Sequence, residues 1–163
     1  MAGDKYELLD APAESAYVKP PAYLSGAGGM VSTAADYLRF VKMLANRGEL
    51  DGVRILGPRT LQLMAMNHLL DGRDLASMNS GGPTESARDG VGFGLGFAVL
   101  LDPTKSQTTG TPGEYYWGGA ASTAFFVSPA EDLAMVFMTQ LMPSSSYPIR
   151  RELRNVIYGS ITD

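Results

Sequence analysis

Apolar side chains recur with the period of an α-helix in the first half of the chain. Thr33 and Asp36 have the spacing of a capping box, and Gly48 is suited to end the helix that they begin. A second helix is predicted to begin at Pro58, because proline is favoured at the first helical position. Between the two helices, residues 50–55 have Asp-Gly at their centre, as a tight hairpin does. The predicted buried faces are formed by Tyr37, Phe40, Val41 and Leu44 in the first helix and by Leu61, Met64 and Ala65 in the second.

The second half of the chain has the patterns of β-strands. Residues 93–101 alternate large apolar side chains with glycine or alanine, which predicts one strand with a nearly bare face. The runs 121–127 and 133–140 are continuously apolar, so we expect two strands of an antiparallel hairpin covered on both faces. A terminal helix is predicted over 151–161, with Leu153, Val156, Ile157 and Ile161 facing inward. The fold class expected is α+β, an antiparallel sheet covered by helices.

These elements predict a single partial domain over residues 1–163. Its expected parts are an extended segment (1–29), where three prolines discourage helix, a helical region (30–67), and the sheet with its terminal helix (91–163). Between the last two lies a polar stretch (68–90), rich in Gly, Ser and Asn. A loop of that length inside a compact domain is uncommon, and we expect it to lie beside a site.

Composition excludes several classes of function. The net charge is −4 and no Lys/Arg cluster is present, so no nucleic-acid partner is expected. The longest nearly apolar run, 91–101, is about half a membrane span, which argues against a membrane segment. No signal peptide is visible, so a cytoplasmic location is favoured. The chain has no cysteine, and disulfides and thiolate chemistry are excluded.

Most residue types that could carry chemistry have a simpler explanation. His68 is the only histidine; we expect it to close the second helix and predict neither a metal site, a cofactor nor a catalytic triad. The carboxylates at 71/74 and 131/132 are interpreted as solvated turn charges. The glycines at 92, 94 and 96 alternate as in a strand and lack the features of a phosphate loop.

Residues 114–123 are the most informative segment. They hold the only tryptophan, next to two tyrosines, followed by Gly118-Gly119 and an apolar strand. One interpretation is a strand edge whose backbone is accessible beside an aromatic wall. The other is an aromatic core residue followed by a bulge, and the chemistry alone does not separate them.

Five pieces of the chain, in this order, carry a resemblance to a known family: 28–40, 50–52, 92–97, 117–119 and the hairpin that ends at Gln140. The chain resembles the C-terminal part of the serine β-lactamase-related hydrolases, in particular the esterases similar to class C β-lactamases. The resemblance covers nearly the whole chain. It implies that the fold is the C-terminal portion of a β-lactamase/transpeptidase-like fold.

The resemblance also implies roles for five residues. Trp117-Gly118-Gly119 stands where the family has a Lys-Thr-Gly-like triplet on a strand edge. The backbone N–H of Ala120 is then one of the two oxyanion donors, and Tyr116, Trp117, Gly118 and Gly119 contact the substrate. Tryptophan in place of the triplet's lysine favours neutral esters over an anionic β-lactam.

The chain departs from the family pattern in its proton-transfer groups. None of its four lysines has a serine three positions before it, so no Ser-x-x-Lys is present. No tyrosine is followed two positions later by asparagine. We therefore expect a fragment of a serine hydrolase that supplies the strand-edge wall and one oxyanion donor, and that is inactive alone.

Three explanations remain open at this point: part of a longer enzyme, one half of a split enzyme, or a stand-alone binding or structural domain without catalysis. The expected partners are accordingly the missing N-terminal portion or a second chain, and a small ester when the enzyme is complete. Uncovered apolar strands also predict self-association of the isolated chain.

Overall fold

The computed structural model describes residues 6–26, 28, 30–78 and 88–162. The chain divides into two compact units, residues 1–33 and 34–163. In the first unit the short 3-10 helix η1 (Ala16–Val18) follows Ser15, whose hydroxyl accepts the Tyr17 N–H at 3.2 Å and donates to Asp10 at 2.7 Å. The other described residues of this unit are irregular, as the prolines predict.

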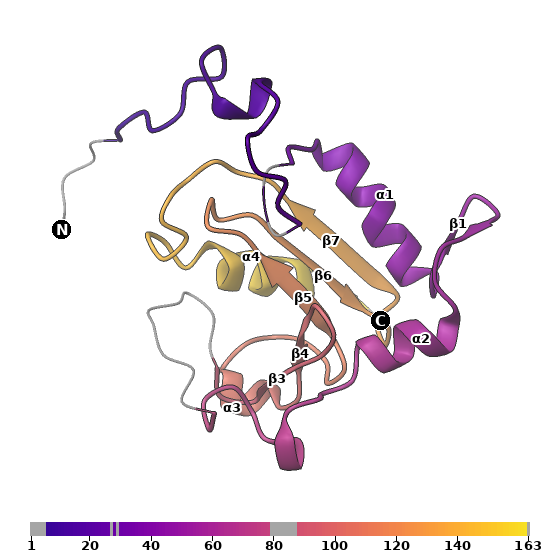
Figure 1. Cartoon of the computed structure of the whole chain (residues 1–163). Helices are drawn as coiled ribbons and strands as arrows, with labels where there is room; N and C mark the ends of the chain where they lie inside the picture. Colours follow the sequence, from indigo (N-terminus) through magenta and orange to yellow (C-terminus); the bar gives the residue numbers. More distant parts are fainter. Residues whose placement is uncertain (1–5, 27, 29, 79–87, 163) are drawn as a thin grey trace. The chain divides into compact units, whose positions relative to one another are not determined.

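The described part of the second unit is built on a five-stranded antiparallel sheet (Figure 1). The spatial order of the strands is their order in the chain, so each strand pairs with its sequence neighbours. This arrangement, with helices packed on the sheet, confirms the predicted α+β class. The strands are β3 (Val91–Phe93), β4 (Ala98–Leu100), β5 (Tyr115–Gly118), β6 (Ala124–Ser128) and β7 (Leu133–Phe137).

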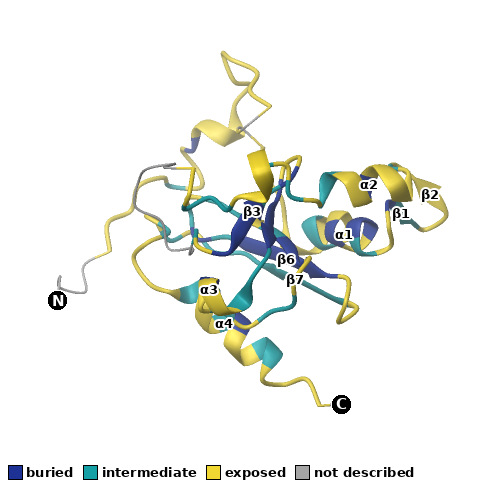
Figure 2. Ribbon diagram, turned by 90° about the horizontal axis from the view of Figure 1, so that it is seen from below, coloured by how far each residue is buried: buried dark blue, intermediate teal, exposed yellow. Residues whose placement is uncertain are grey.

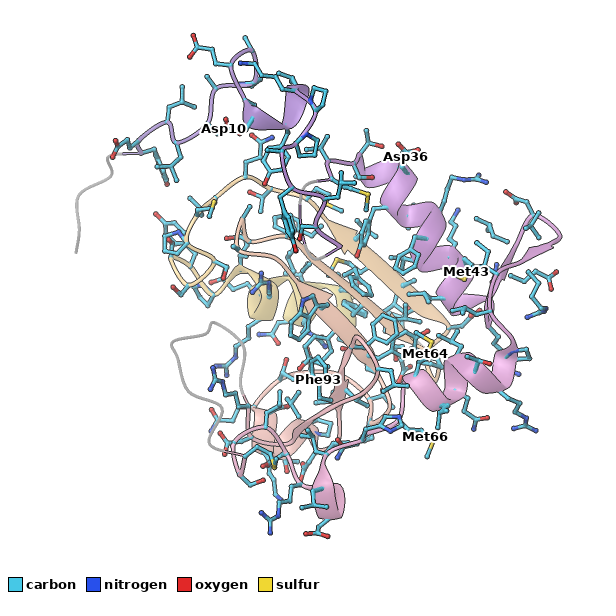
Figure 3. The ribbon with its side chains drawn as sticks, viewed as in Figure 1. Asp10, Asp36, Met43, Met64, Met66 and Phe93 are labelled. Atoms are coloured by element: carbon cyan, nitrogen blue, oxygen red, sulfur yellow. The ribbon has the colours of Figure 1, made fainter. Side chains whose placement is uncertain are left out.

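Helix α1 (Ala34–Ala45) covers one face of the sheet over β6 and β7 (Figure 1). Val41 and Leu44 are fully buried, whereas Phe40 remains 40% exposed at the rim of the predicted face. Gly48 follows the helix at φ +94°, and a Cβ there would lie 2.2 Å from the Leu56 carbonyl oxygen. Only glycine fits that position. The core on this face contains Val41, Met43, Leu44, Leu61, Phe97, Val99, Tyr115, Phe125 and Val127, with Met43 of α1 labelled in Figure 3.

The elements between α1 and the sheet form as their local sequence predicts. Strands β1 (Glu49–Leu50) and β2 (Val53–Arg54) form a hairpin whose Asp51-Gly52 turn has positive φ at both residues. Helix α2 (Pro58–Met64) begins at its proline and buries Leu61. The His68 ring donates through Nε2 to the Leu63 carbonyl at 2.7 Å, and so it closes the last turn of α2.

The single strand predicted over 93–101 is wrong, because these residues form the β3–β4 hairpin. The chain reverses at residues 94–97, where the Gly94 N–H donates to the Phe97 carbonyl at 2.7 Å and Gly96 has φ +99°. A Cβ on Gly94 would lie 2.1 Å from the Met64 carbonyl oxygen. The glycines therefore allow a turn that packs against the end of α2. The alternation of large and small residues continues through this turn, so the sequence pattern does not reveal it.

The segment after α2 covers the outer edge of β3. The His68 N–H donates to the Phe93 carbonyl at 2.8 Å, and the Phe93 N–H donates to Asn67 Oδ1 at 3.1 Å. The Leu75 N–H reaches the Val91 carbonyl at 2.7 Å. Described residues of the predicted loop contain only the 3-10 helix η2 (Leu70–Gly72), and residues 79–87 of that loop lie outside the described residues.

Helices α3 (Pro103–Ser106) and α4 (Ile149–Tyr158) lie on the opposite face of the sheet from α1 (Figure 2). Successive residues of β6 show the two faces: Phe125 packs against Tyr37 of α1, and Phe126 stacks on Tyr158 of α4 with ring centroids 6.0 Å apart. Strand β6 is buried throughout, so both of its faces are covered as predicted.

The predicted inward face of the terminal helix is wrong in part. Val156 is 71% and Ile161 41% exposed, whereas the buried residue of α4 is Arg154. The cause is a carboxylate inside the protein: Glu114 is completely buried, forms an ion pair with Arg154, and accepts a hydrogen bond from the Tyr158 hydroxyl. Burial raises the pKa of Glu114, and the Arg154 guanidinium opposes that rise.

Aromatic rings complete the surroundings of Arg154. Its guanidinium carbon lies 4.5 Å from the ring centroid of Tyr116 and 4.9 Å from that of Phe126. These cation–π contacts add to the ion pair and help to hold α4 against β5 and β6.

No helix among the described residues is long and apolar enough to cross a membrane.

We expect Arg154→Met to destabilise the chain by roughly 3–5 kcal/mol, because it leaves the Glu114 carboxylate buried without its cation. The double variant Glu114→Gln/Arg154→Met removes both charges and should recover a large part of that loss. Urea unfolding at one low protein concentration measures both. Arg151→Met, on the exposed side of the same helix, is the matched control. Equal losses in the single and double variants would show that the ion pair does not determine the packing of α4.

Candidate active site

The open part of the sheet lies at the end of β5. β5 is the middle strand, yet β4 pairs with it only at Tyr115 and Tyr116. Beyond that point Trp117 and Gly118 pair with β6 alone. The predicted strand edge is therefore confined to the last residues of β5, because the β3–β4 hairpin turns before it can cover them.

Five residues, 119–123, join β5 to β6. The Gly119 N–H donates to the Thr123 carbonyl, and the Ser122 N–H donates to the Gly119 carbonyl, both at 3.1 Å. Ser122 has φ +64°, and its buried hydroxyl donates to the Leu141 carbonyl at 2.7 Å. This is a type of hairpin loop that combines a β-turn with a left-handed residue. We refer to residues 119–123 as the β5–β6 turn.

Ala120 occupies the second position of this turn and is exposed. The two hydrogen bonds of the turn use the peptide groups of Gly119, Ser122 and Thr123. Among the described residues, no hydrogen bond from the Ala120 N–H is found. An exposed residue with an unused N–H therefore stands next to the open edge of β5.

Aromatic side chains stand beside that edge. Phe93, labelled in Figure 3, meets Trp117 edge to face with ring centroids 5.3 Å apart, and Trp117 is 49% exposed. Tyr116 lies beneath the Arg154 guanidinium, and burial raises the pKa of Tyr116 to about 12. Burial thus disfavours the phenolate form of Tyr116.

A cavity of about 350 Å³ brings these residues together. All five residues to which the sequence assigned a site role line it, namely Tyr116, Trp117, Gly118, Gly119 and Ala120. The cavity has the size and the mixed apolar and polar lining of a small-molecule site. Three arginines that the sequence analysis did not single out also line it: Arg88, Arg150 and Arg154.

Arg150 and Arg154 lie four positions apart on α4, so they point to the same side of the helix. That spacing was a signal in the sequence, but the apolar residues of the same helix predicted a different inward face. The Arg150 guanidinium lies against Gly118, where an added Cβ would be 2.7 Å from three of its atoms. The first glycine of the Trp-Gly-Gly triplet thus makes room for a cation from α4.

The other candidate groups lie in ordinary structural settings. Asp74 accepts the N–H groups of Gly90 and Ser77, and these hydrogen bonds hold its pKa below the usual value. Glu131 accepts the Thr111 hydroxyl, and Asp71 lies 3.7 Å from Arg73. In the described ranges, no group of three His, Cys, Asp or Glu residues is arranged to hold a metal ion.

The chain is similar in sequence to proteins of one known family. The family model described as Beta-lactamase matches residues 2–158. Esterase EstB of Burkholderia gladioli is 33% identical over 149 residues, which is 90% of this chain and 34% of EstB. Protein Rv1367c of Mycobacterium tuberculosis is 39% identical over 133 residues, 80% of this chain and 32% of that protein.

Solved structures agree with the sequence relatives. EstCE1, described as a hydrolase with promiscuous acyltransferase activity, superposes with a TM-score of 0.68 at 30% identity, over 86% of this chain and 33% of EstCE1. Simvastatin synthase (LovD) of Aspergillus terreus shares the fold at 23% identity, with a TM-score of 0.59 over 78% of this chain and 34% of LovD. The chain spans about a third of the length of the curated relatives it matches.

We expect Gly118→Ala to destabilise the chain by about 1–2 kcal/mol, because the new methyl group displaces Arg150 from its hydrogen bonds to the β5–β6 turn. In an Arg150→Met background the same change should cost much less, and thermal unfolding of the four variants gives this coupling. Gly26→Ala is the control, because a Cβ there meets nothing within 4 Å. Additive effects of the two substitutions would contradict the close contact.

Proposed function

The chain belongs to the Beta-lactamase family, and from that premise we propose that it forms one wall of a serine hydrolase that cleaves small esters through an acyl-serine. One observation carries the proposal: Ala120, an exposed residue whose N–H makes no hydrogen bond among the described residues, lines a cavity at the open end of β5 with Trp117, Gly118 and Gly119. A backbone donor fixed at a strand edge is suited to stabilise an oxyanion.

In this mechanism a serine oxygen attacks the ester carbonyl carbon while a base takes the hydroxyl proton, and the carbonyl electron pair moves onto the carbonyl oxygen; the base later gives that proton to the leaving alcohol. The Ala120 N–H donates to that oxyanion together with a second donor, the N–H of the nucleophilic serine. When the tetrahedral intermediate collapses, the bond to the alcohol oxygen breaks and the alcohol leaves with a proton. Water then attacks the acyl-serine by the reverse sequence, releasing the acid and restoring the serine hydroxyl.

The nucleophile and its base come, in this proposal, from residues outside the 163. The four lysines, at 5, 19, 42 and 105, are not preceded by a serine at the required spacing. The matched relatives are about three times as long as the region they share with this chain. The missing groups belong either to the same longer polypeptide or to a second chain.

The proposed substrates are neutral esters of small size. Trp117 supplies an aromatic surface where the triplet of the wider family has a cation, and its contact with Phe93 extends that surface. Arg150 and Arg154, which also line the cavity, are bonded to the β5–β6 turn and to Glu114. EstB is named an esterase and EstCE1 is described as a hydrolase, which supports ester cleavage. A non-catalytic binding domain is the alternative, and the presence of a Ser-x-x-Lys upstream in the same reading frame would distinguish the two.

The 163-residue chain alone should form no acyl-enzyme. Incubation with a fluorophosphonate probe, followed by intact-protein mass spectrometry, should show no adduct. Chain produced together with the N-terminal portion, in one polypeptide or as two chains, should gain one adduct and hydrolyse a p-nitrophenyl ester. A stoichiometric adduct on any serine of the isolated chain would refute the assignment of the nucleophile to another segment.

We further propose that the N-terminal portion, or in its absence a second copy of the chain, covers apolar surface of this unit. Leu63, Met66 and Leu95 are each at least half exposed. The Leu95 N–H donates to the Met64 carbonyl at 2.8 Å, so the three lie in adjoining segments. β7 ends the five-stranded sheet, and an unpaired edge favours pairing with another strand.

Analytical ultracentrifugation at micromolar concentration should therefore find dimers or larger species of the isolated 17.4 kDa chain. Addition of the N-terminal portion should convert them to a one-to-one complex. A monomer that does not bind a dye for apolar surfaces would support the stand-alone domain instead.

A further inference from the structure

Arg150, in the first turn of α4, bonds to the backbone of the β5–β6 turn. One of its terminal nitrogens, Nη2, donates to the Gly119 carbonyl at 2.6 Å and to the Thr123 carbonyl at 3.0 Å. Its Nε donates to the Thr123 carbonyl at 3.2 Å. The guanidinium also lies against the bare Cα of Gly118. A single side chain from a distant helix therefore connects both ends of the turn.

The Gly119 carbonyl belongs to the same peptide group as the Ala120 N–H. A peptide group is planar, and in the trans form its C=O and N–H point in opposite directions. The cis peptide bond found in the described chain lies elsewhere, at Met142-Pro143. Whatever holds the Gly119 oxygen therefore also sets the direction in which the Ala120 N–H points.

This hydrogen bond acts on the strength of the donor as well as on its direction. A cation bound to a carbonyl oxygen draws electron density from the peptide group, and chained hydrogen bonds polarise one another. The Ala120 N–H thereby becomes a better donor to a developing negative charge. The neutral Ser122 N–H, which also bonds to the Gly119 oxygen, has a weaker effect of the same kind.

The hairpin also has hydrogen bonds that do not involve Arg150. The Gly119 N–H bond to Thr123, the Ser122 N–H bond to Gly119 and the pairing of β5 with β6 are made without it. Arg150 itself is held in place because Arg154, one turn further along α4, is buried in the ion pair with Glu114. The guanidinium thus adds its bonds to those that the turn makes within itself.

We infer that Arg150 is a positioning residue that orients and polarises the Gly119–Ala120 peptide group so that the Ala120 N–H donates to the oxyanion. The inference rests on the proposed function, since an oxyanion donor is needed only if the site performs acyl transfer. Arg150 does not contact the reacting atoms in this role. It acts through the peptide group of the turn.

The first test reads the turn directly, in the 163-residue chain and without any assay of activity. In Arg150→Met, amide exchange of Ser122 and Gly119 should accelerate about tenfold or more, and the Ala120 amide nitrogen resonance should shift. The Phe126 amide in β6 should change little. Arg150→Lys keeps a cation, so its exchange rates at Gly119 and Ser122 should lie between those of the wild type and Arg150→Met. Arg151→Met should match the wild type. Unchanged exchange at Ser122 overturns the inference, whether or not ester hydrolysis is found.

The second test uses the enzyme completed by its N-terminal portion and a p-nitrophenyl ester. Arg150→Met should lower kcat about tenfold or more at nearly constant KM, because a misdirected oxyanion donor weakens binding of the transition state alone. Arg150→Lys should recover part of kcat. A change confined to KM would assign Arg150 to substrate binding and overturn the positioning role. If the completed wild-type enzyme lacks activity, the proposed function fails, and the exchange measurement still decides whether Arg150 holds the peptide group.

Discussion

The buried ion pair between Glu114 and Arg154 is the contact on which the arrangement of the candidate site depends. Glu114 precedes β5 directly, and Arg154 lies near the middle of α4, so the pair links the central strand to the terminal helix. Taking two charges out of water is costly, and removing one partner alone costs more than replacing both. The register of α4 on the sheet is consequently set by a charge requirement and less by apolar packing. That register determines where Arg150 and the Tyr116 surface meet the end of β5.

Much of the fold could be predicted from local patterns, and the errors have physical causes. The helical period gave α1 and α2, and the apolar runs gave the β6–β7 hairpin, because those signals lie within each element. The β3–β4 turn was missed because glycines at 94 and 96 preserve the strand period while they allow reversal. The inward face of α4 was wrong because Arg154 is buried by Glu114, a residue 40 positions away. Local periodicity contains no information about such a partner.

In the candidate site, too, residues with a local sequence signal were predicted and residues that depend on distant partners were not. Trp117, Gly118 and Gly119 were identified through family resemblance, and Ala120 followed by position, because a backbone donor requires no particular side chain. Arg150 was missed because its bonds span 27 and 31 residues, and an arginine near a helix start has no local signal of that role. Gly118 carried a partial signal, since a glycine in a strand indicates a close approach. The sequence could not say that the approaching group is a guanidinium.

The order of the strands has a consequence for how this unit folds. From β3 to β7 every strand pairs with the one that follows it in the chain, and the loops between them are short or moderate in length. Contacts between residues close in sequence require little loop-closure entropy, and low contact order is associated with rapid folding. The strand pairing of this sheet is thus encoded within the 91–137 segment itself. Contacts of long sequence separation come from the helices on its two faces, through Tyr37 on one side and Arg154 on the other, and from the segment after α2 at the edge of β3. Because these contacts close longer loops, we expect them to form later than the strand pairing.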